Sequence, residues 1–126
     1  METPYDDREG SIWLDGNMIS WKDAKVHVLT HALHYGSSVF EGERAYGGKI
    51  FESEKHSIRL IESGKYLDMP VPYRVDQIEL AKHEVLRRAS AEDLYIRAIA
   101  WRGSGLDMGV ASARNKVHLA IAAWEW

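Results

Sequence analysis

The chain has 126 residues, of which 45% are hydrophobic and 28% are charged, and its formal net charge is −3. This length and composition are typical of one globular domain, and the slight acidity argues against a nucleic-acid surface, which needs clustered basic residues. The chain contains no cysteine, which excludes disulfide bonds and thiol chemistry.

The first thirty residues predict a lead-in followed by short strands. Residues 1–10 are polar, unlike a signal peptide, and are expected to be a flexible lead-in. Residues 11–14 and 17–21 alternate like two strands around Asp15-Gly16, a dipeptide typical of two-residue hairpin turns. Residues 25–30 are expected to form another strand. The apolar runs of the whole chain are too short to cross a bilayer, so we expect a cytoplasmic protein.

The middle of the chain predicts a long strand followed by two helices. The long strand starts near Val39, and a short strand is expected over residues 49–51. Ser53 is expected to cap a helix that runs to about residue 67, with Ile58 among its apolar positions. A second helix is expected over residues 75–89, where apolar residues recur at helical spacing.

Two more strands are expected over residues 94–102 and 116–124, which gives about six strands with two helices between them. This order predicts an α+β fold, a two-layer sandwich in which an antiparallel or mixed sheet carries both helices on one face. The last residues have the pattern of a strand with neither a turn nor a polar tail after it. We therefore expect the chain to continue in a longer protein.

The long central strand places Phe40, Gly42 and Arg44 on one face, because side chains alternate along a strand. A glycine inside a strand often marks a place where a ligand or another backbone approaches closely. An arginine fork beside an aromatic ring, with bare backbone between them, suits a small molecule that carries a carboxylate. The alternative is an edge strand with a solvated arginine and a glycine of no special meaning.

The strand over residues 94–102 carries a similar face, with Tyr95 and Arg97 two residues apart. If it pairs with the central strand, two arginines and two aromatic residues share one surface of the sheet. Burying an arginine there without an anion is costly, and Glu41 and Glu43, the alternative partners, point to the other face. The pattern therefore favours a site for a small organic anion.

Two further features leave alternatives open. His27, His31 and His34 could present three imidazoles to a metal ion if they lay on one helix, but no cysteine or carboxylate accompanies them. We therefore assign no metal site and expect His31 and His34 to make hydrogen bonds that fix the loop before the central strand. Arg59 lies within a predicted helix, where it is either solvated or a ligand for an anion.

Four stretches carry a resemblance to a known family. They are residues 24–36, Val39-Phe40-Glu41-Gly42-x-Arg44, His56-x-x-Arg59-Leu60 and Tyr95-Ile96-Arg97. Their order and spacing resemble branched-chain amino acid aminotransferases, which are class IV, fold-type IV enzymes that use pyridoxal phosphate. D-amino acid aminotransferases and aminodeoxychorismate lyases share that fold and are the alternative members.

The resemblance implies a substrate site on the paired strands. Phe40 matches a wall of the pocket for the substrate side chain, and Gly42 lies in the same run. Arg44 and Arg97 match arginines of the substrate site, with Arg97 associated with the distal carboxylate of glutamate. Tyr95 matches a tyrosine near the substrate carboxylate.

The resemblance also implies contacts with a cofactor and with a second subunit. Arg59 matches the arginine that binds the phosphate of pyridoxal phosphate. Tyr35 and Val110 match positions that reach into the substrate site of the neighbouring subunit. A homodimer or a higher homo-oligomer is therefore expected.

One departure from the family pattern limits what this chain is expected to do alone. In the family, the Schiff-base lysine and most other cofactor contacts lie on a second, larger domain, and no lysine of this chain matches that motif. We therefore expect residues 11–126 to be the small N-terminal domain, truncated before the large catalytic domain. It would have no catalytic residue of its own, would not hold the cofactor alone and would be inactive.

The parent protein would transfer an amino group between leucine, isoleucine or valine and 2-oxoglutarate. The rival functions are a non-catalytic binding module for a small organic anion and a small metal-binding domain built on the three histidines. The first rival depends only on the face with two arginines and two aromatic residues, and the second depends only on the three histidines.

Overall fold

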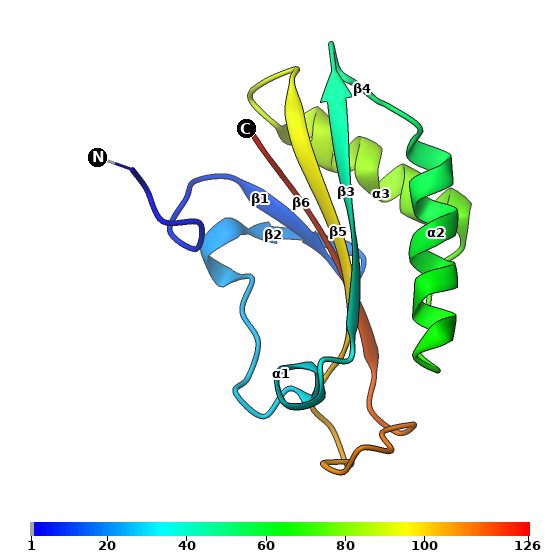
Figure 1. Cartoon of the computed structure of the whole chain (residues 1–126). Coiled ribbons are helices and arrows are strands. Elements are labelled where there is room, and N and C mark those ends of the chain that lie inside the picture. The colour runs from blue at the N-terminus through cyan, green and yellow to red at the C-terminus, as the bar shows by residue number, and fades with distance from the viewer. Residues whose placement is uncertain (1) are drawn as a thin grey trace.

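The computed structural model describes residues 2–126 and contains one six-stranded sheet with two long helices (Figure 1). The elements, in chain order, are β1 (Ser11–Leu14), β2 (Asn17–Ser20), a 3-10 turn (Trp21–Asp23), α1 (His31–Tyr35), β3 (Ser38–Tyr46), β4 (Lys49–Ile50), α2 (Ser53–Tyr66), α3 (Val75–Arg88), β5 (Leu94–Arg102) and β6 (Val117–Trp124).

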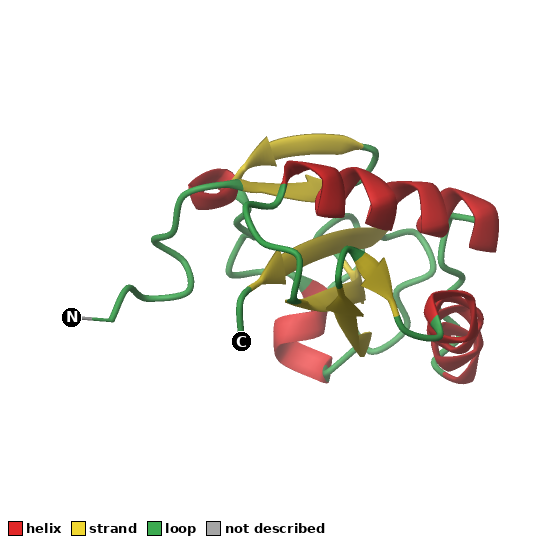
Figure 2. Ribbon diagram, turned by 90° about the horizontal axis from the view of Figure 1, so that it is seen from above, coloured by secondary structure: helices red, strands yellow, loops and turns green. Residues whose placement is uncertain are grey.

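The strands lie in the order β2-β1-β6-β5-β3-β4, and every neighbouring pair is antiparallel. The predicted α+β fold is therefore confirmed. Of the two sheet types expected, antiparallel or mixed, the sheet is antiparallel. Both long helices pack on one face of the sheet, which leaves the other face open. The N-terminal lead-in and the C-terminal end lie on the same side of the molecule, away from α2 (Figures 1 and 2).

The core forms because the strands alternate with a period of two. Along β5, every second residue from Leu94 to Arg102 is buried beneath the helices, and the residues between them are only partly covered. Leu60 from α2, Ile78 from α3 and Ile96 from β5 are fully buried in the same cluster. Burial of such side chains contributes about 1.5–3 kcal/mol each to stability.

The strand expected over residues 25–30 does not form. Val26 and Val28 are exposed, and Thr30 N and Oγ1 both donate to the carbonyl of His27, which turns the chain. The short helix α1 follows, which the sequence interpretation did not include. A strand needs a partner for its backbone groups, and within residues 2–126 the six strands pair only with one another.

The start and the buried side of α2 also differ from the prediction. Glu52, in a left-handed conformation with φ of 55°, occupies the N-cap position, and Ser53 is already helical. Ser53 Oγ instead donates to the carboxylate of Glu79 on α3. The buried side of α2 contains Leu60 rather than Ile58, which is partly exposed. The prediction failed because the bond to Glu79 connects two helices and cannot be inferred from the spacing within one.

The structure bears only partly on the N-terminal lead-in, and it also bears on the expected lack of a membrane-spanning segment. Met1 lies outside the described residues, and the flexibility of residues 1–10 stays a prediction, although the Tyr5 ring packs edge-on against Trp124 at 5.4 Å. Within residues 2–126, the helices are too short or too polar for a membrane span.

Candidate functional site

The predicted substrate residues of β3 and β5 lie together on the open face of the sheet. Strand pairing sets Gly42 opposite Arg97 and Arg44 opposite Tyr95, and Phe40 follows on the same face. We call Phe40, Gly42, Arg44, Tyr95 and Arg97 the open-face group. The two strands pair, so the condition set in the sequence analysis is met, and both arginines and both aromatic residues lie on one surface.

Arg97 connects the members of the open-face group. Its Nε and Nη2 donate to the Tyr95 hydroxyl at 3.0 and 2.7 Å, and its guanidinium lies 4.1 Å from the centre of the Phe40 ring. Because the hydroxyl oxygen accepts both bonds, its own proton is available for another acceptor. A carboxylate beside this cluster would meet a phenolic donor and a positive charge together.

Gly42 leaves room for the Tyr95 side chain as it is placed here. A Cβ atom at residue 42 would run into the Tyr95 hydroxyl oxygen and the ring carbon that bears it. The bare backbone therefore accommodates the Tyr95 ring within the sheet face. The glycine does mark a close approach, and the approaching group is a side chain of the neighbouring strand.

Aromatic rings border the open-face group on the β6 side. The Tyr95 ring lies 4.9 Å from that of Trp124 and 4.7 Å from that of Trp126. The Arg44 guanidinium lies 5.6 Å from the Trp126 ring. These rings restrict where Tyr95 can move and give the surface an apolar wall beside its two cations.

Tyr35 and Val110 lie at the far end of the sheet, on α1 and on the loop after β5. The Tyr35 hydroxyl donates to the carbonyl of Met108 at 2.8 Å, and His31 Nε2 lies 2.9 Å from the carbonyl of Gly109. Val110 projects from this loop with 77% of its surface exposed. Within residues 2–126, no hydrogen bond or ring contact joins these two residues to the open-face group, so they form a separate surface.

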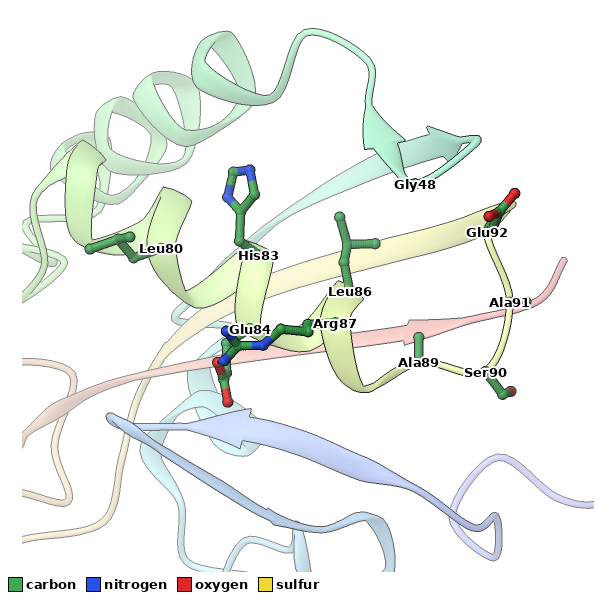
Figure 3. Close-up of a pocket in the computed structure, with 10 residues that line it drawn as sticks. All are labelled: Gly48, Leu80, His83, Glu84, Leu86, Arg87, Ala89, Ser90, Ala91 and Glu92. Carbon is green, nitrogen blue, oxygen red and sulfur yellow. The ribbon is translucent and has the colours of Figure 1, made fainter.

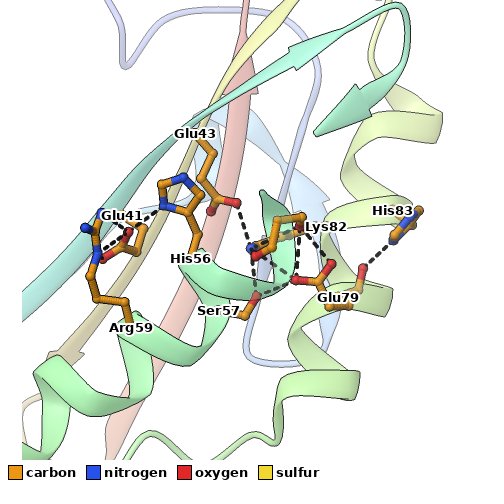
Figure 4. Close-up of polar contacts among 9 residues, drawn as sticks. Glu41, Glu43, His56, Ser57, Arg59, Glu79, Lys82 and His83 are labelled. Atoms are coloured by element: carbon orange, nitrogen blue, oxygen red, sulfur yellow. Dashed lines mark hydrogen bonds and ion pairs between the residues drawn. The ribbon is translucent and has the colours of Figure 1, made fainter. Parts of the chain in front are cut away.

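Arg59 lies on α2 and faces the opposite side of β3, where it binds a carboxylate of this chain (Figure 4). Its Nε lies 2.9 Å from Glu41 Oε2, and its Nη2 lies 2.7 Å from Glu41 Oε1. His56 Nδ1 lies 2.6 Å from the same Oε1. The Arg59 side chain remains 65% exposed, while that of Glu41 is 4% exposed.

The Glu41 carboxyl is charged in this setting. Burial alone would raise its pKa, but the hydrogen bonds and charges of Arg59 and His56 outweigh burial and hold the pKa below its ordinary value of 4.5. His56 Nδ1 must then carry a proton, because an ionised carboxylate only accepts.

The donors of Arg59 fit a cofactor phosphate as one ligand among several. Its bonds to Glu41 use Nε and Nη2, so Nη1 remains for an external anion. One guanidinium nitrogen cannot surround a phosphate, and the open-face group lies on the other face of the sheet. Further phosphate contacts would have to come from outside this chain.

A buried ionic cluster between α2, α3 and β3 was not predicted from the sequence (Figure 4). Lys82 Nζ donates to Glu43 Oε1 and to Ser57 Oγ, each at 2.7 Å, and both charged side chains are fully buried. Burial raises the pKa of Glu43, although Lys82 opposes this, and Glu43 Oε2 has no hydrogen-bond partner. Two acidic residues on the helix-covered face of β3 were the available signal, since they require basic partners from the helices.

The histidines bind separate protein groups. His31 Nδ1 lies 2.7 Å from Ser37 Oγ, and His34 Nε2 lies 2.9 Å from the carbonyl of Val28. His27 Nδ1 accepts from the backbone of Leu29. His31 and His34 therefore make the bonds expected of them around the loop before β3. Within residues 2–126, no cluster of three metal-ligating side chains occurs.

A hollow of about 660 Å³ lies between the end of α3 and the turn that precedes β4 (Figure 3). It contains none of the predicted site residues. Of its lining residues, Glu84 pairs with Arg87 and also with Arg88 on the surface of α3. Such surface pairs are common on helices, and this hollow lacks a group of converging donors like that of the open face.

Comparison with known proteins places these features in a family. A model of the family described as amino-transferase class IV matches residues 38–126. The chain is 45% identical over 124 residues to the branched-chain-amino-acid aminotransferase of Pseudomonas aeruginosa, an alignment that covers 95% of this chain and 40% of the relative.

Solved structures give a similar result. The crystal structure of the Escherichia coli branched-chain amino acid aminotransferase matches with a TM-score of 0.88 and 39% identity, over 94% of this chain and 40% of that chain. A T.th. branched-chain amino acid aminotransferase matches with a TM-score of 0.88 and 42% identity, over 94% of this chain and 42% of that chain. The T.th. enzyme was also solved with pyridoxamine 5'-phosphate and complexed with N-(5'-phosphopyridoxyl)-L-glutamate.

The chain spans about 40% of the length of these relatives. The family match covers well over half of the chain and includes β3 and β5 with the whole open-face group. This chain therefore belongs to the class IV aminotransferase family.

Proposed function

We propose that the protein containing this chain transfers an amino group between branched-chain L-amino acids and 2-oxoglutarate, with pyridoxal phosphate as its cofactor. The observation that carries the proposal is the open-face group, in which Arg97 lies between the Phe40 ring and the Tyr95 hydroxyl. Membership of the class IV family and the activities for which the relatives are named support it.

The open-face group suits two unlike substrates. Such an enzyme must accept the apolar side chain of leucine and the anionic side chain of glutamate in one pocket. Phe40 would contact the first, and Arg97 would hold the distal carboxylate of the second through charge-assisted hydrogen bonds. The Tyr95 hydroxyl would donate a hydrogen bond to the α-carboxylate. Arg44 would add positive charge at the edge of the same surface.

The cofactor contact proposed for this chain is Arg59. When bound, pyridoxal phosphate supplies the electron sink and the amino-group carrier of the reaction. Arg59 would contribute Nη1 to its phosphate, while Glu41 holds the other two nitrogens of the guanidinium. Tyr35 and Val110 would contact the substrate of a neighbouring subunit, in a homodimer or a higher homo-oligomer.

A large C-terminal domain would supply the Schiff-base lysine and the remaining cofactor contacts. Lys82 cannot take that role, because its side chain is fully buried and surrounded by Glu43 and Ser57. We therefore expect residues 1–126 alone to be inactive. A cytoplasmic location completes the proposal.

Transamination by the full-length protein tests the proposal directly. The purified protein with added pyridoxal phosphate is expected to convert leucine and 2-oxoglutarate to glutamate, and borohydride is expected to fix the cofactor to one lysine. Residues 1–126 treated in the same way should give neither activity nor labelling of one specific lysine.

The rival functions predict different outcomes. A full-length protein that binds the cofactor but transfers no amino group from leucine, isoleucine or valine would be another fold-type IV enzyme. A protein that binds organic anions without binding the cofactor would be a non-catalytic module.

A further inference from the structure

We propose that Glu41 is a positioning residue that holds the guanidinium of Arg59 ready for the cofactor phosphate. This inference rests on the proposed function, because it takes the contact between Arg59 and the phosphate as given. It assigns the contact's preorganisation to a carboxylate on β3, the strand whose other face carries Phe40 and Gly42.

The geometry fixes two of the three guanidinium nitrogens. Arg59 Nε lies 3.0 and 2.9 Å from the two oxygens of Glu41, and Nη2 lies 2.7 Å from Oε1. A fork-to-fork arrangement of this kind sets both the position and the plane of the guanidinium. Nη1 has no partner among the described residues and can donate to an external anion.

The carboxylate is itself held firmly. Its side chain is 4% exposed and receives a further bond from His56 Nδ1 at 2.6 Å, so two side chains of α2 converge on one residue of β3. Arg59 is mostly exposed and would otherwise sample many rotamers. Immobilising a long side chain before the ligand arrives removes that ordering cost from the binding step.

The sign of the effect separates positioning from simple electrostatics. A carboxylate near a phosphate repels it, so neutralising Glu41 would strengthen phosphate binding if charge alone mattered. If positioning dominates, neutralising Glu41 weakens phosphate binding because Arg59 is released. The two accounts therefore predict opposite changes for one substitution.

The experiment uses the full-length protein with its cofactor removed. Dissociation constants are measured by absorbance for pyridoxal phosphate and for pyridoxal, which lacks the phosphate, and their ratio isolates the phosphate contribution. The variants are Glu41→Gln, Glu41→Asp, Arg59→Ala and the double variant Glu41→Gln/Arg59→Ala. Glu43→Gln is the matched control, since it changes a buried carboxylate of β3 that contacts Lys82 and not Arg59.

Glu41→Gln is expected to weaken binding of pyridoxal phosphate by about fivefold to tenfold and to leave pyridoxal unchanged, the size expected for releasing one long side chain. Glu41→Asp should act in the same direction, because a shorter carboxylate cannot hold the fork. Arg59→Ala should have the larger effect, and the double variant should match it. Glu43→Gln should leave the ratio unchanged.

Three results would overturn the inference while leaving the proposed function intact. They are a tighter or unchanged ratio in Glu41→Gln, an equal weakening for both ligands, and additive effects in the double variant. Failure of the unaltered protein to bind pyridoxal phosphate would instead overturn the proposed function and this inference with it. Glu41→Asp keeps the test decisive if Glu41→Gln does not fold.

Discussion

Glu41 and Glu43 lie two residues apart on β3 and point to the same side of the sheet, yet they meet different surroundings. Glu43 is sealed beneath the helices with Lys82, and both side chains are fully buried. Glu41 is almost as deeply buried, but its partner Arg59 is largely exposed to solvent. One ion pair is therefore closed to ligands, and the other presents a cation at the surface.

The pKa values of the two carboxyls shift in opposite directions for a physical reason. Burial acts on both carboxyls and by itself would raise the pKa of each. Arg59 and His56 together outweigh burial at Glu41, whereas Lys82 does not at Glu43, one of whose oxygens has no partner. Neighbouring carboxyls on one strand face therefore take part in two unlike ion pairs, a sealed one at Glu43 and one that reaches solvent through Arg59 at Glu41.

The largest expected effect is on the sealed pair. Lys82→Met would leave Glu43 buried without its cation, which should lower the free energy of unfolding by about 3–5 kcal/mol. Urea unfolding followed by tryptophan fluorescence measures this loss. The double variant Lys82→Met/Glu43→Leu should recover most of it, because an apolar pair of similar volume needs no charge partner. A double variant no more stable than the single one would contradict this account.

The open face of β3 should respond through packing. Gly42→Ala would push its methyl group into the Tyr95 hydroxyl and should lower the free energy of unfolding by about 1–3 kcal/mol. Tyr95→Phe removes the hydroxyl oxygen, so Gly42→Ala should cost less in that background. A double-mutant cycle by urea unfolding measures the coupling. Strict additivity would mean that the Tyr95 hydroxyl does not explain the need for glycine.

The smallest expected effect is a change in pH dependence at Glu41. Its pKa is lowered in the folded protein, so its contribution to stability is present above the ordinary value of 4.5 and is lost as pH falls through the folded value. Arg59→Ala removes the hydrogen bonds and the charge of Arg59, which lower this pKa, and should therefore raise it. The stability difference between the unaltered protein and Arg59→Ala should therefore grow from about pH 3 to about pH 6. A constant difference would show that Arg59 does not set this pKa.

Much of the sheet could be predicted because its signals are local. The Asp15-Gly16 dipeptide marks the hairpin of β1 and β2, and a period of two assigns the faces of β3 and β5. That assignment is enough to place Phe40 and Arg97 on one surface once the two strands pair. The open-face group could therefore be predicted from the sequence.

The missed features depend on contacts between distant segments. Lys82 follows an apolar residue of α3, and the sequence alone suggests that it is exposed to solvent. Its burial depends on Glu43, which lies far away in the sequence and accepts a hydrogen bond from it. Ser53 was expected to cap its own helix, but it binds Glu79 of the next one. Helix α1 is too short to have a periodic pattern of its own, and its position depends on His31 and the loop after β5.

The central claim is that the open face of the sheet recognises the substrate, and Arg97→Ala in the full-length protein tests it most directly. A charge-assisted hydrogen bond to a carboxylate is worth about 1.5–3 kcal/mol, so the glutamate half-reaction should lose roughly 10- to 100-fold in kcat/KM. The leucine half-reaction should change much less, because its side chain carries no anion, whereas Phe40→Ala should slow leucine more than glutamate. Single-turnover rates for each amino acid give both values. Equal slowing of both half-reactions by Arg97→Ala would contradict the account, since Arg97 would then act on the shared α-carboxylate or on Tyr95 alone.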